Sequence, residues 1–328
     1  MSNRDGVKAT NAAAGPAVVL LVLAALALLA SVAAACGGSS DDPGETPVAT
    51  PSAADVIPIL VSHELTVGEN RFVVGLQDRD NNLILDAEVH LRFFRLADGE
   101  GTLEAEADTF PVTVQESFVH EHEDDSSHVH TGDEVGVYVA HVTFDEPGLW
   151  GVEVSAAVEG EVKEPARVQF DVLEGSNTPA VGDPAPRSAQ ATLRDVTDIS
   201  EIDSSSPPRT AMHELTIAEA IDSGQPTVLA FATPAFCQSR VCGPLMDSVV
   251  APLFQRYGEQ VNFVHVEPYE LAKARQGEIV PVPAVEEWGL QTEPWLFIID
   301  REGRIAGKFE AIVSVEEVEP VLQRVVGE

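Results

Sequence analysis

Two cysteines in the C-terminal third of the chain are the residues best suited to chemistry. Cys237 and Cys242 follow an apolar run at 226–233, with four residues between them. A regular helix would hold Cα atoms five residues apart at roughly 8–9 Å, whereas a disulfide needs them within about 7 Å. Pro244 is typical of a first helical turn. The spacing therefore predicts a helix that starts just after Cys242, with Cys237 in the preceding loop.

Two cysteines at this spacing can serve three different purposes. A dithiol that opens and closes would exchange with substrate disulfides, a permanent disulfide would pin the loop, and two thiolates would bind a metal ion. The start of a helix favours a thiolate at Cys242, and Arg240 lies in the loop between the cysteines. We favour the redox-active pair, because a dithiol at the end of a strand is well placed for exchange chemistry.

The chain around the cysteines alternates between helical and strand patterns. Short apolar runs predict buried strands, and a period of three to four residues predicts helices. The predicted strands cover 226–233, 261–266, 295–300 and 305–309, and the predicted helices cover 215–223, 245–257 and 315–326. The segment 277–289 is predicted to connect elements, and the Ser- and Pro-rich stretch 203–209 is predicted to form a surface loop.

The order of these elements resembles the thioredoxin superfamily over residues 211–328. The resemblance is carried by the cysteine pair after an apolar strand, by VNFVHVE at 261–267 and by TEPWLFIIDREGRI at 292–305. The phrase VGDPAP at 181–186 resembles the opening of extracytoplasmic thioredoxin-like and peroxiredoxin-like domains. The resemblance implies an α/β thioredoxin-like fold and thiol–disulfide exchange.

The same resemblance implies roles for individual residues. Pro294 occupies the position of the family's cis-proline beside the dithiol. Alignment from Phe231 implies that Cys237 is the attacking sulfur and Cys242 the resolving thiol. The chain departs from the family in having four residues rather than two between the cysteines. It also has Ala230 where many members carry a buried acid.

A histidine cluster lies in the N-terminal half, at His120, His122, His128 and His130. If 123–127 is a five-residue hairpin loop, His122 pairs with His128 and His120 with His130. Residues two apart on a strand share a face, so the four imidazoles would then gather on one surface. Imidazole suits zinc and copper(II), so the segment predicts a copper or zinc site. The alternative is a solvated acidic hairpin whose histidines bind nothing.

Four other histidines are interpreted as structural. His63, His90 and His141 are interpreted as ordinary strand residues and are not taken as ligands. His265 lies in the predicted strand at 261–266 and is interpreted as a core histidine whose ring is hydrogen-bonded. Thiol–disulfide exchange by itself requires no cofactor.

Residues 55–174 are predicted to form an all-β sandwich. Short apolar runs separated by turn residues predict strands at 71–76, 87–96, 135–144, 149–158 and 166–172. Along 135–144 the side chains alternate, with Val137 and Val139 on one face and Tyr138 and Ala140 on the other. The stretch 137–150 resembles the last strands of immunoglobulin-like domains in bacterial copper-resistance and YtkA-like proteins, which implies an immunoglobulin-like sandwich.

The N-terminus is typical of a bacterial lipoprotein. Residues 1–35 have a basic start and an apolar run that predict a secretory signal peptide, and AAAC at 33–36 resembles a lipobox with Cys36 as the lipidated residue. The alternative is an uncleaved membrane anchor. Residues 36–54 are predicted to be a flexible tether, and a linker at 175–186 leads into the second domain at 187–328.

The net charge of the chain limits the kinds of molecule that it can bind. Among 328 residues, 54 are acidic and 19 basic, which gives a net charge of −35. Such a chain is a poor binder of nucleic acid, whose affinity depends on Lys and Arg. We expect a membrane-tethered oxidoreductase that faces outside the cytoplasm and acts on protein thiols or disulfides. The alternative is a copper-binding or copper-delivery lipoprotein that uses the thiol pair and the histidine hairpin.

Overall fold

The computed structural model describes residues 55–121 and 127–327. These residues belong to a compact unit that spans 53–328. The predicted signal peptide, Cys36, the tether and His122 lie outside the described residues. Within the described part of the chain, no helix is both long and apolar enough to cross a bilayer.

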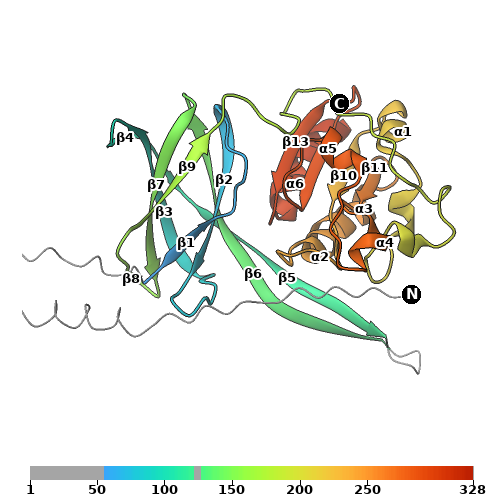
Figure 1. Cartoon of the computed structure of the whole chain (residues 1–328), viewed down its shortest axis with the longest axis horizontal. Helices are drawn as coiled ribbons and strands as arrows, with labels where there is room; N and C mark the ends of the chain where they lie inside the picture. Colours follow the sequence, from blue (N-terminus) through green and yellow to red (C-terminus); the bar gives the residue numbers. More distant parts are fainter. Residues whose placement is uncertain (1–54, 122–126, 328) are drawn as a thin grey trace, which may run out of the picture. The chain divides into compact units, whose positions relative to one another are not determined.

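The N-terminal half of this unit consists of strands in two sheets (Figure 1). One sheet has the strand order β1-β2-β6-β5, and the other has the order β4-β3-β7-β8 with β9 also paired to β7. The strands are β1 (Ile57–Leu60), β2 (Gly68–Gln77), β3 (Ala87–Ala97), β4 (Glu100–Asp108), β5 (Phe110–Glu121), β6 (Ser127–Phe144), β7 (Gly148–Val158), β8 (Glu161–Val162) and β9 (Ala166–Val172). All five predicted strands are present, and the prediction of a β-rich domain is confirmed.

The core of this half lies between the two sheets. Tyr138, Ala140 and Phe144 of β6 belong to one buried cluster with apolar side chains of β2, β3, β7 and β9. Trp150 is 1% exposed, and its ring centroid lies 4.8 Å from that of Phe144. Every second side chain of β6 therefore points into the space between the two sheets, as expected for a strand, in which successive side chains point to opposite faces.

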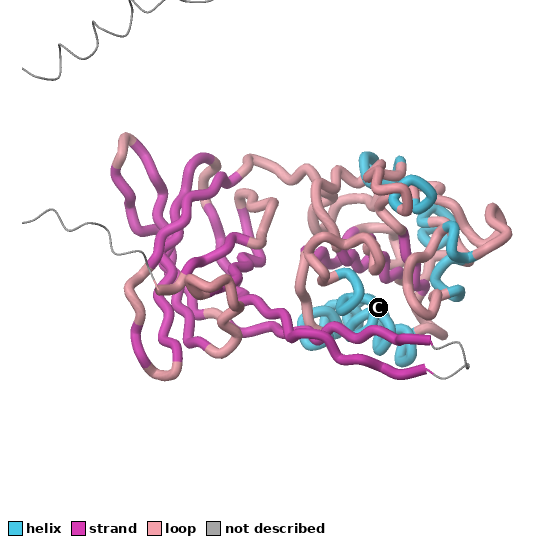
Figure 2. Tube along the Cα trace, turned by 60° about the horizontal axis from the view of Figure 1, so that its bottom comes forward, coloured by secondary structure: helices cyan, strands magenta, loops and turns pink. Residues whose placement is uncertain are grey.

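The opposite face of the β1-β2-β6-β5 sheet is also covered. Val137 and Val139 form a second buried cluster with valines of β2 and β5, and Val241 and Ile312 of the C-terminal half complete it. Strand β5 also contacts α2 (Cys242–Pro244), and Figure 2 shows the β5–β6 hairpin running beside helices. The middle of this sheet is therefore buried on both faces, whereas Thr113 of β5 and His141 of β6 are exposed.

The C-terminal half has one mixed four-stranded sheet flanked by helices. The strand order is β11-β10-β12-β13, with β10 parallel to β11 and antiparallel to β12, and β12 antiparallel to β13. Its strands are β10 (Thr227–Phe231), β11 (Asn262–Val266), β12 (Trp295–Ile299) and β13 (Ile305–Glu310), and its helices are η1 (Ile199–Glu201), η2 (Thr210–His213), α1 (Ile217–Asp222), α2, η3 (Leu245–Val250), α3 (Ala251–Tyr257), α4 (Leu271–Ala274), α5 (Pro283–Glu287) and α6 (Val315–Gly327).

Both faces of this sheet are buried, which explains the continuous apolar runs of its strands. Val228 and Ala230 of β10 pack into a cluster with α2, η3, α3 and α6. Leu229 and Phe231 point to the other face and pack with α1 and α5. The helix that contains Cys242 therefore covers one side of the strand that ends just before the cysteine loop.

Three sequence-based expectations for this half were inaccurate. The helix begins at Cys242 rather than after it, so Pro244 is its third residue. The segment 277–289 contains α5, which is too short to show a helical period in the sequence. The predicted surface loop at 203–209 is partly buried, because Asp203 is 2% exposed and Ser205 is 8% exposed.

Candidate functional site

The two cysteines lie where β10 ends and α2 begins. Cys237 is in the loop and partly exposed, Cys242 is buried at the start of the helix, and both are free thiols. The backbone N–H of Cys242 donates a hydrogen bond to Sγ of Cys237 at 3.3 Å. The hydroxyl of Ser239 lies 3.2 Å from the same sulfur. The fold thus brings the two predicted residues together.

The surroundings of the two thiols make them chemically unequal. A hydrogen bond from the Cys242 thiol, together with those from Ser239 and the backbone, lowers the pKa of Cys237 to about 6 despite partial burial. Burial raises the pKa of Cys242 far above that of an ordinary thiol. The expectation that the helix start favours a thiolate at Cys242 is therefore wrong, because its N–H group stabilises the sulfur of Cys237 instead.

Pro294 and two unpredicted residues lie near the dithiol. The Glu293–Pro294 peptide bond is cis, as the resemblance to the thioredoxin superfamily implied. Tyr269 donates a hydrogen bond from its hydroxyl to Oε2 of Glu293 at 2.5 Å. Burial and this bond raise the pKa of Tyr269, and the charges of both cysteines add to the rise. The position of Glu293 directly before Pro294 was a signal available in the sequence.

The cysteine loop is held by the N-terminal half of the unit. Val241, directly before Cys242, is 5% exposed and packs with Val112, Val114 and other valines of the sandwich. Arg240, before it, has a φ of 60°, which is uncommon for a residue with a side chain. Contacts from a distant part of the sequence thus support the segment that leads into Cys242.

The histidine hairpin has a different register from the one predicted. His128 pairs with His120, and His130 pairs with Phe118. The register shifts between Gln115 and Ser117, where a bulge changes the pairing farther along the hairpin. His122 lies in the segment 122–126, outside the described residues, so the copper or zinc site predicted here stays a prediction.

Three other histidines have partners outside the dithiol. Nδ1 of His63 lies 2.8 Å from Glu310, and Nδ1 of His90 lies 2.8 Å from Asp108. The ring of His141 stacks on Phe110, with 6.1 Å between the ring centroids. His63 lies in the loop after β1 rather than on a strand.

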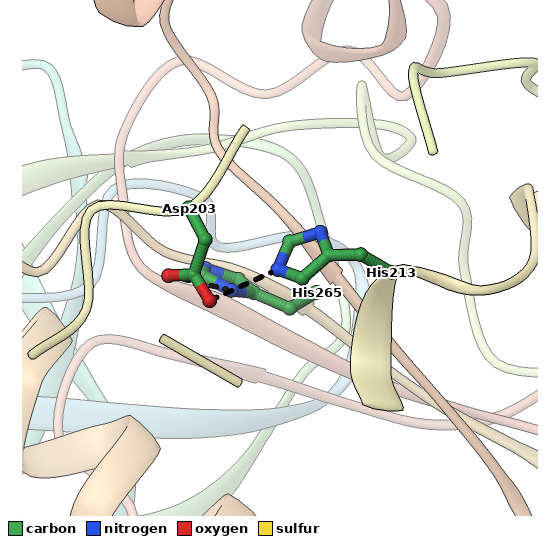
Figure 3. Close-up of side chains that lie close together, drawn as sticks. All are labelled: Asp203, His213 and His265. Atoms are coloured by element: carbon green, nitrogen blue, oxygen red, sulfur yellow. Dashed lines mark ion pairs between the residues drawn. The ribbon is translucent and has the colours of Figure 1, made fainter. Parts of the chain in front are cut away.

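A second group of chemically competent residues lies inside the C-terminal half (Figure 3). Asp203 follows η1, His213 ends η2 and His265 lies on β11, and all three side chains are buried. Oδ2 of Asp203 lies 3.2 Å from Nε2 of His213, and Oδ1 lies 3.7 Å from Nδ1 of His265. Such a group could hold a metal ion.

The sequence analysis missed two of these three residues. His265 is buried and its Nε2 bonds to the carbonyl oxygen of Ala232 at 2.9 Å, as expected of a core histidine, but its Nδ1 has no hydrogen-bond partner among the described residues. Asp203 and His213 come from two further segments of the chain. Their spacing carries no recognisable motif, so no local signal could have linked them.

Comparison with known proteins adds no family to this description. No protein-family model matches the chain, and no curated protein matches it. The function of the site is therefore argued from its own residues and geometry.

Proposed function

We propose that this chain is a lipid-anchored, extracytoplasmic thiol–disulfide oxidoreductase that reacts through Cys237 and Cys242. The observation that carries the proposal is the difference between the two thiols. Cys237 is partly exposed with a pKa of about 6, while Cys242 is buried beside it with a raised pKa. The sulfur of Cys237 is thus a thiolate at neutral pH and can reach a substrate, whereas Cys242 stays protonated until the second step of the reaction.

The proposed reaction begins with the thiolate of Cys237. It attacks one sulfur of a substrate disulfide, the substrate S–S bond breaks, and the leaving sulfur departs as a thiolate that takes up a proton. Cys242 then loses its proton and attacks Sγ of Cys237, which releases the second substrate sulfur. Two electrons pass from the dithiol to the substrate, and an external dithiol restores the reduced pair. The reverse sequence would oxidise a substrate dithiol.

A thioredoxin-like fold for residues 187–328 is part of this proposal. It is supported by a mixed sheet in which the cysteine loop joins a central strand to a helix packed on one face. The position of Pro294 directly before β12 supports it as well. The immunoglobulin-like half would serve as a rigid base for the loop, since its valines cover Val241.

The redox midpoint of the pair tests the proposal. We would equilibrate the chain without residues 1–36 in glutathione buffers of graded potential and count free thiols by trapping and intact mass. Cys237 and Cys242 are then the remaining cysteines, so the count is unambiguous. A midpoint above about −250 mV is expected, whereas a disulfide still closed below about −300 mV would identify a structural bond and overturn the proposal.

A matched pair of variants tests the order of the cysteines. Cys242→Ser should form a stable mixed disulfide with glutathione or an aromatic disulfide, because nothing remains to resolve it. Cys237→Ser should react much more slowly, since the remaining thiol is buried and protonated. Equal reactivity of the two variants would contradict the assigned roles.

A further inference from the structure

We propose that Asp203, His213 and His265 bind one divalent transition-metal ion, with Zn²⁺ as the representative ion. This site is separate from the predicted histidine hairpin and does not depend on the redox chemistry of the cysteines. Its three candidate ligand atoms are Oδ of Asp203, Nε2 of His213 and Nδ1 of His265, and all lie within 4.8 Å of one another. Figure 3 shows both imidazoles turned toward the carboxylate.

Neighbouring groups hold the carboxylate in place. Oδ1 of Asp203 accepts a hydrogen bond from the backbone N–H of Ser205 at 2.7 Å. Oδ2 accepts a hydrogen bond from the backbone N–H of Arg209 at 2.6 Å. Each carboxylate oxygen can accept a further interaction. The carboxylate is therefore fixed in orientation beside the two imidazoles.

The ring of His265 is oriented as a metal ligand requires. Its Nε2 faces the carbonyl oxygen of Ala232 at 2.9 Å, and because a carbonyl can only accept, Nε2 carries the hydrogen. A neutral imidazole that carries its hydrogen on Nε2 has an acceptor at Nδ1. Nδ1 then has a free lone pair directed toward Asp203. A ligating histidine whose other nitrogen donates to a carbonyl is a common arrangement in metal sites.

The spacing of the ligand atoms fits a tetrahedral ion. Zn–N and Zn–O bonds of about 2.0–2.1 Å put neighbouring ligand atoms about 3.3 Å apart around a tetrahedron. The observed separations from Asp203 are 3.2 Å to His213 and 3.7 Å to His265. All three ligand atoms lie within 4.8 Å of one another, so they would have to move closer together to coordinate one ion.

A cavity beside the site provides access and room for a fourth ligand. The cavity has a volume of about 480 Å³, and His213, His265, Glu267 and Tyr269 contribute to its lining. Glu267 is 5% exposed, and its Oε2 lacks a hydrogen-bond partner among the described residues. Water in this cavity could complete the coordination, as it does at the open position of many zinc sites.

The donor set narrows the class of ion. Two imidazoles and a carboxylate suit borderline divalent ions such as zinc or iron(II). They suit copper(I) poorly, because it favours sulfur, and they suit magnesium and calcium poorly, because those ions favour oxygen. Without a metal, the same residues would be a buried contact between Asp203 and His213. This is the alternative that the experiment must distinguish.

The test uses the full chain without residues 1–36, in which the other candidate metal ligands are neutralised. His120, His122, His128 and His130 are changed to Gln, and Cys237 and Cys242 to Ser, which defines the parent protein. We expect the parent to bind one equivalent of Zn²⁺ in a calorimetric titration. With Co²⁺ it should show the visible absorption of a tetrahedral site with nitrogen and oxygen ligands. Failure to bind a stoichiometric ion would overturn the proposal.

Variants of the parent assign the bound ion to these residues. Asp203→Asn and His213→Gln should each weaken Zn²⁺ binding by more than about 100-fold, because loss of even an outer partner costs 10–100-fold. His90→Gln is the matched control, since His90 also pairs with an aspartate but on the protein surface. Unchanged binding in both site variants would overturn the assignment. If a variant fails to fold, the proposal is tested by the Co²⁺ spectrum and the Zn²⁺ stoichiometry of the parent protein.

Discussion

Arg71 of β2 and Glu317 of α6 form a two-pronged ion pair that joins the two halves of the compact unit. Nε of Arg71 lies 2.7 Å from Oε1 of Glu317, and Nη2 lies 3.1 Å from Oε2. The side chains are 11% and 10% exposed. Arg71 also donates to the carbonyl oxygens of Glu310 and Ile312, at 3.2 and 2.6 Å. The guanidinium is therefore the centre of a largely desolvated contact between strand and helix.

Removal of this guanidinium should be costly. Arg71→Ala leaves the Glu317 carboxylate and two carbonyl oxygens without their partner in a poorly solvated place. We expect the free energy of unfolding to fall by about 3 kcal/mol or more, as for a broken buried ion pair. Urea denaturation followed by circular dichroism measures this change.

A surface pair on the same helix provides the control. Arg256 lies 2.8 Å from Glu319 of α6, and its side chain is 50% exposed. Arg256→Ala should cost less than about 1 kcal/mol, because water replaces the lost partner. Equal costs for the two variants would show that the Arg71 contact contributes no more than a surface pair.

The reactivity of Cys237 should depend on pH with an acidic midpoint. Its thiolate is the nucleophile, so the rate of alkylation by iodoacetamide should rise with pH and reach half its maximum near pH 6. Ser239→Ala removes the hydroxyl that lies 3.2 Å from the sulfur, so the midpoint should move upward by a fraction of a pH unit to about one unit. A wild-type midpoint above about pH 8 would contradict the predicted stabilisation of the thiolate.

Glu64 should make part of the stability dependent on pH. Burial opposes its ionisation, but hydrogen bonds from Ser176, Lys308 and Thr178 lower its pKa to about 2. Because the folded pKa lies below the unfolded one, this stabilisation is complete above about pH 4.5 and is lost as the pH falls toward 2. The difference between the unfolded and folded pKa corresponds to a contribution of Glu64 to the free energy of unfolding of about 3 kcal/mol at most. The side chain is 7% exposed, so solvent screens it little.

Glu64→Gln should therefore be less stable than the wild type at pH 6, and the difference should shrink by pH 3. Urea midpoints at several pH values measure the difference. Glu161→Gln serves as the control, because that carboxylate is 76% exposed and should contribute little at any pH. A wild-type–Glu64→Gln difference that does not change with pH would refute the prediction.

Gly289 is required where the chain around Asn177 passes close to the C-terminal half. Its φ is +64°, and a Cβ atom there would lie 2.2 Å from the carbonyl oxygen of Asn177. Gly277 has a φ of +84° but open space around it. Gly277→Ala should cost about 1–2 kcal/mol from backbone strain alone. Gly289→Ala should cost at least about 2 kcal/mol more, because the backbone must also move. Similar thermal unfolding of the two variants would show that the close approach to Asn177 is unimportant.

Local patterns in the sequence were sufficient for most of the strands and for the position of the cysteines. Alternation along β6 identified its sandwich face, because the period of a strand is two whatever it packs against. The five-residue separation of Cys237 and Cys242 placed Cys237 in the loop and the helix start within one residue of Cys242, because a helix cannot bring the two sulfurs together. These features depend on backbone geometry over a few residues.

Features that join distant segments could not be read in this way. The register of the histidine hairpin depends on a bulge near Gln115, and a bulge leaves no clear mark in composition. The valine face of the first sheet proved to be covered by Val241 and Ile312, which come more than a hundred residues later. Such pairings depend on how the two halves pack, not on the local pattern of either.

The sequence by itself determined which residues could react at the dithiol, while the tertiary structure decided how they differ. Cys237 is the more acidic thiol because Cys242 and Ser239 bond to its sulfur, and Cys242 is the weaker acid because it is buried. The group of Asp203, His213 and His265 was decided by the tertiary structure alone. Its members come from three segments, and only the packing of η2 and the loop after η1 against β11 excludes water and brings their polar atoms together.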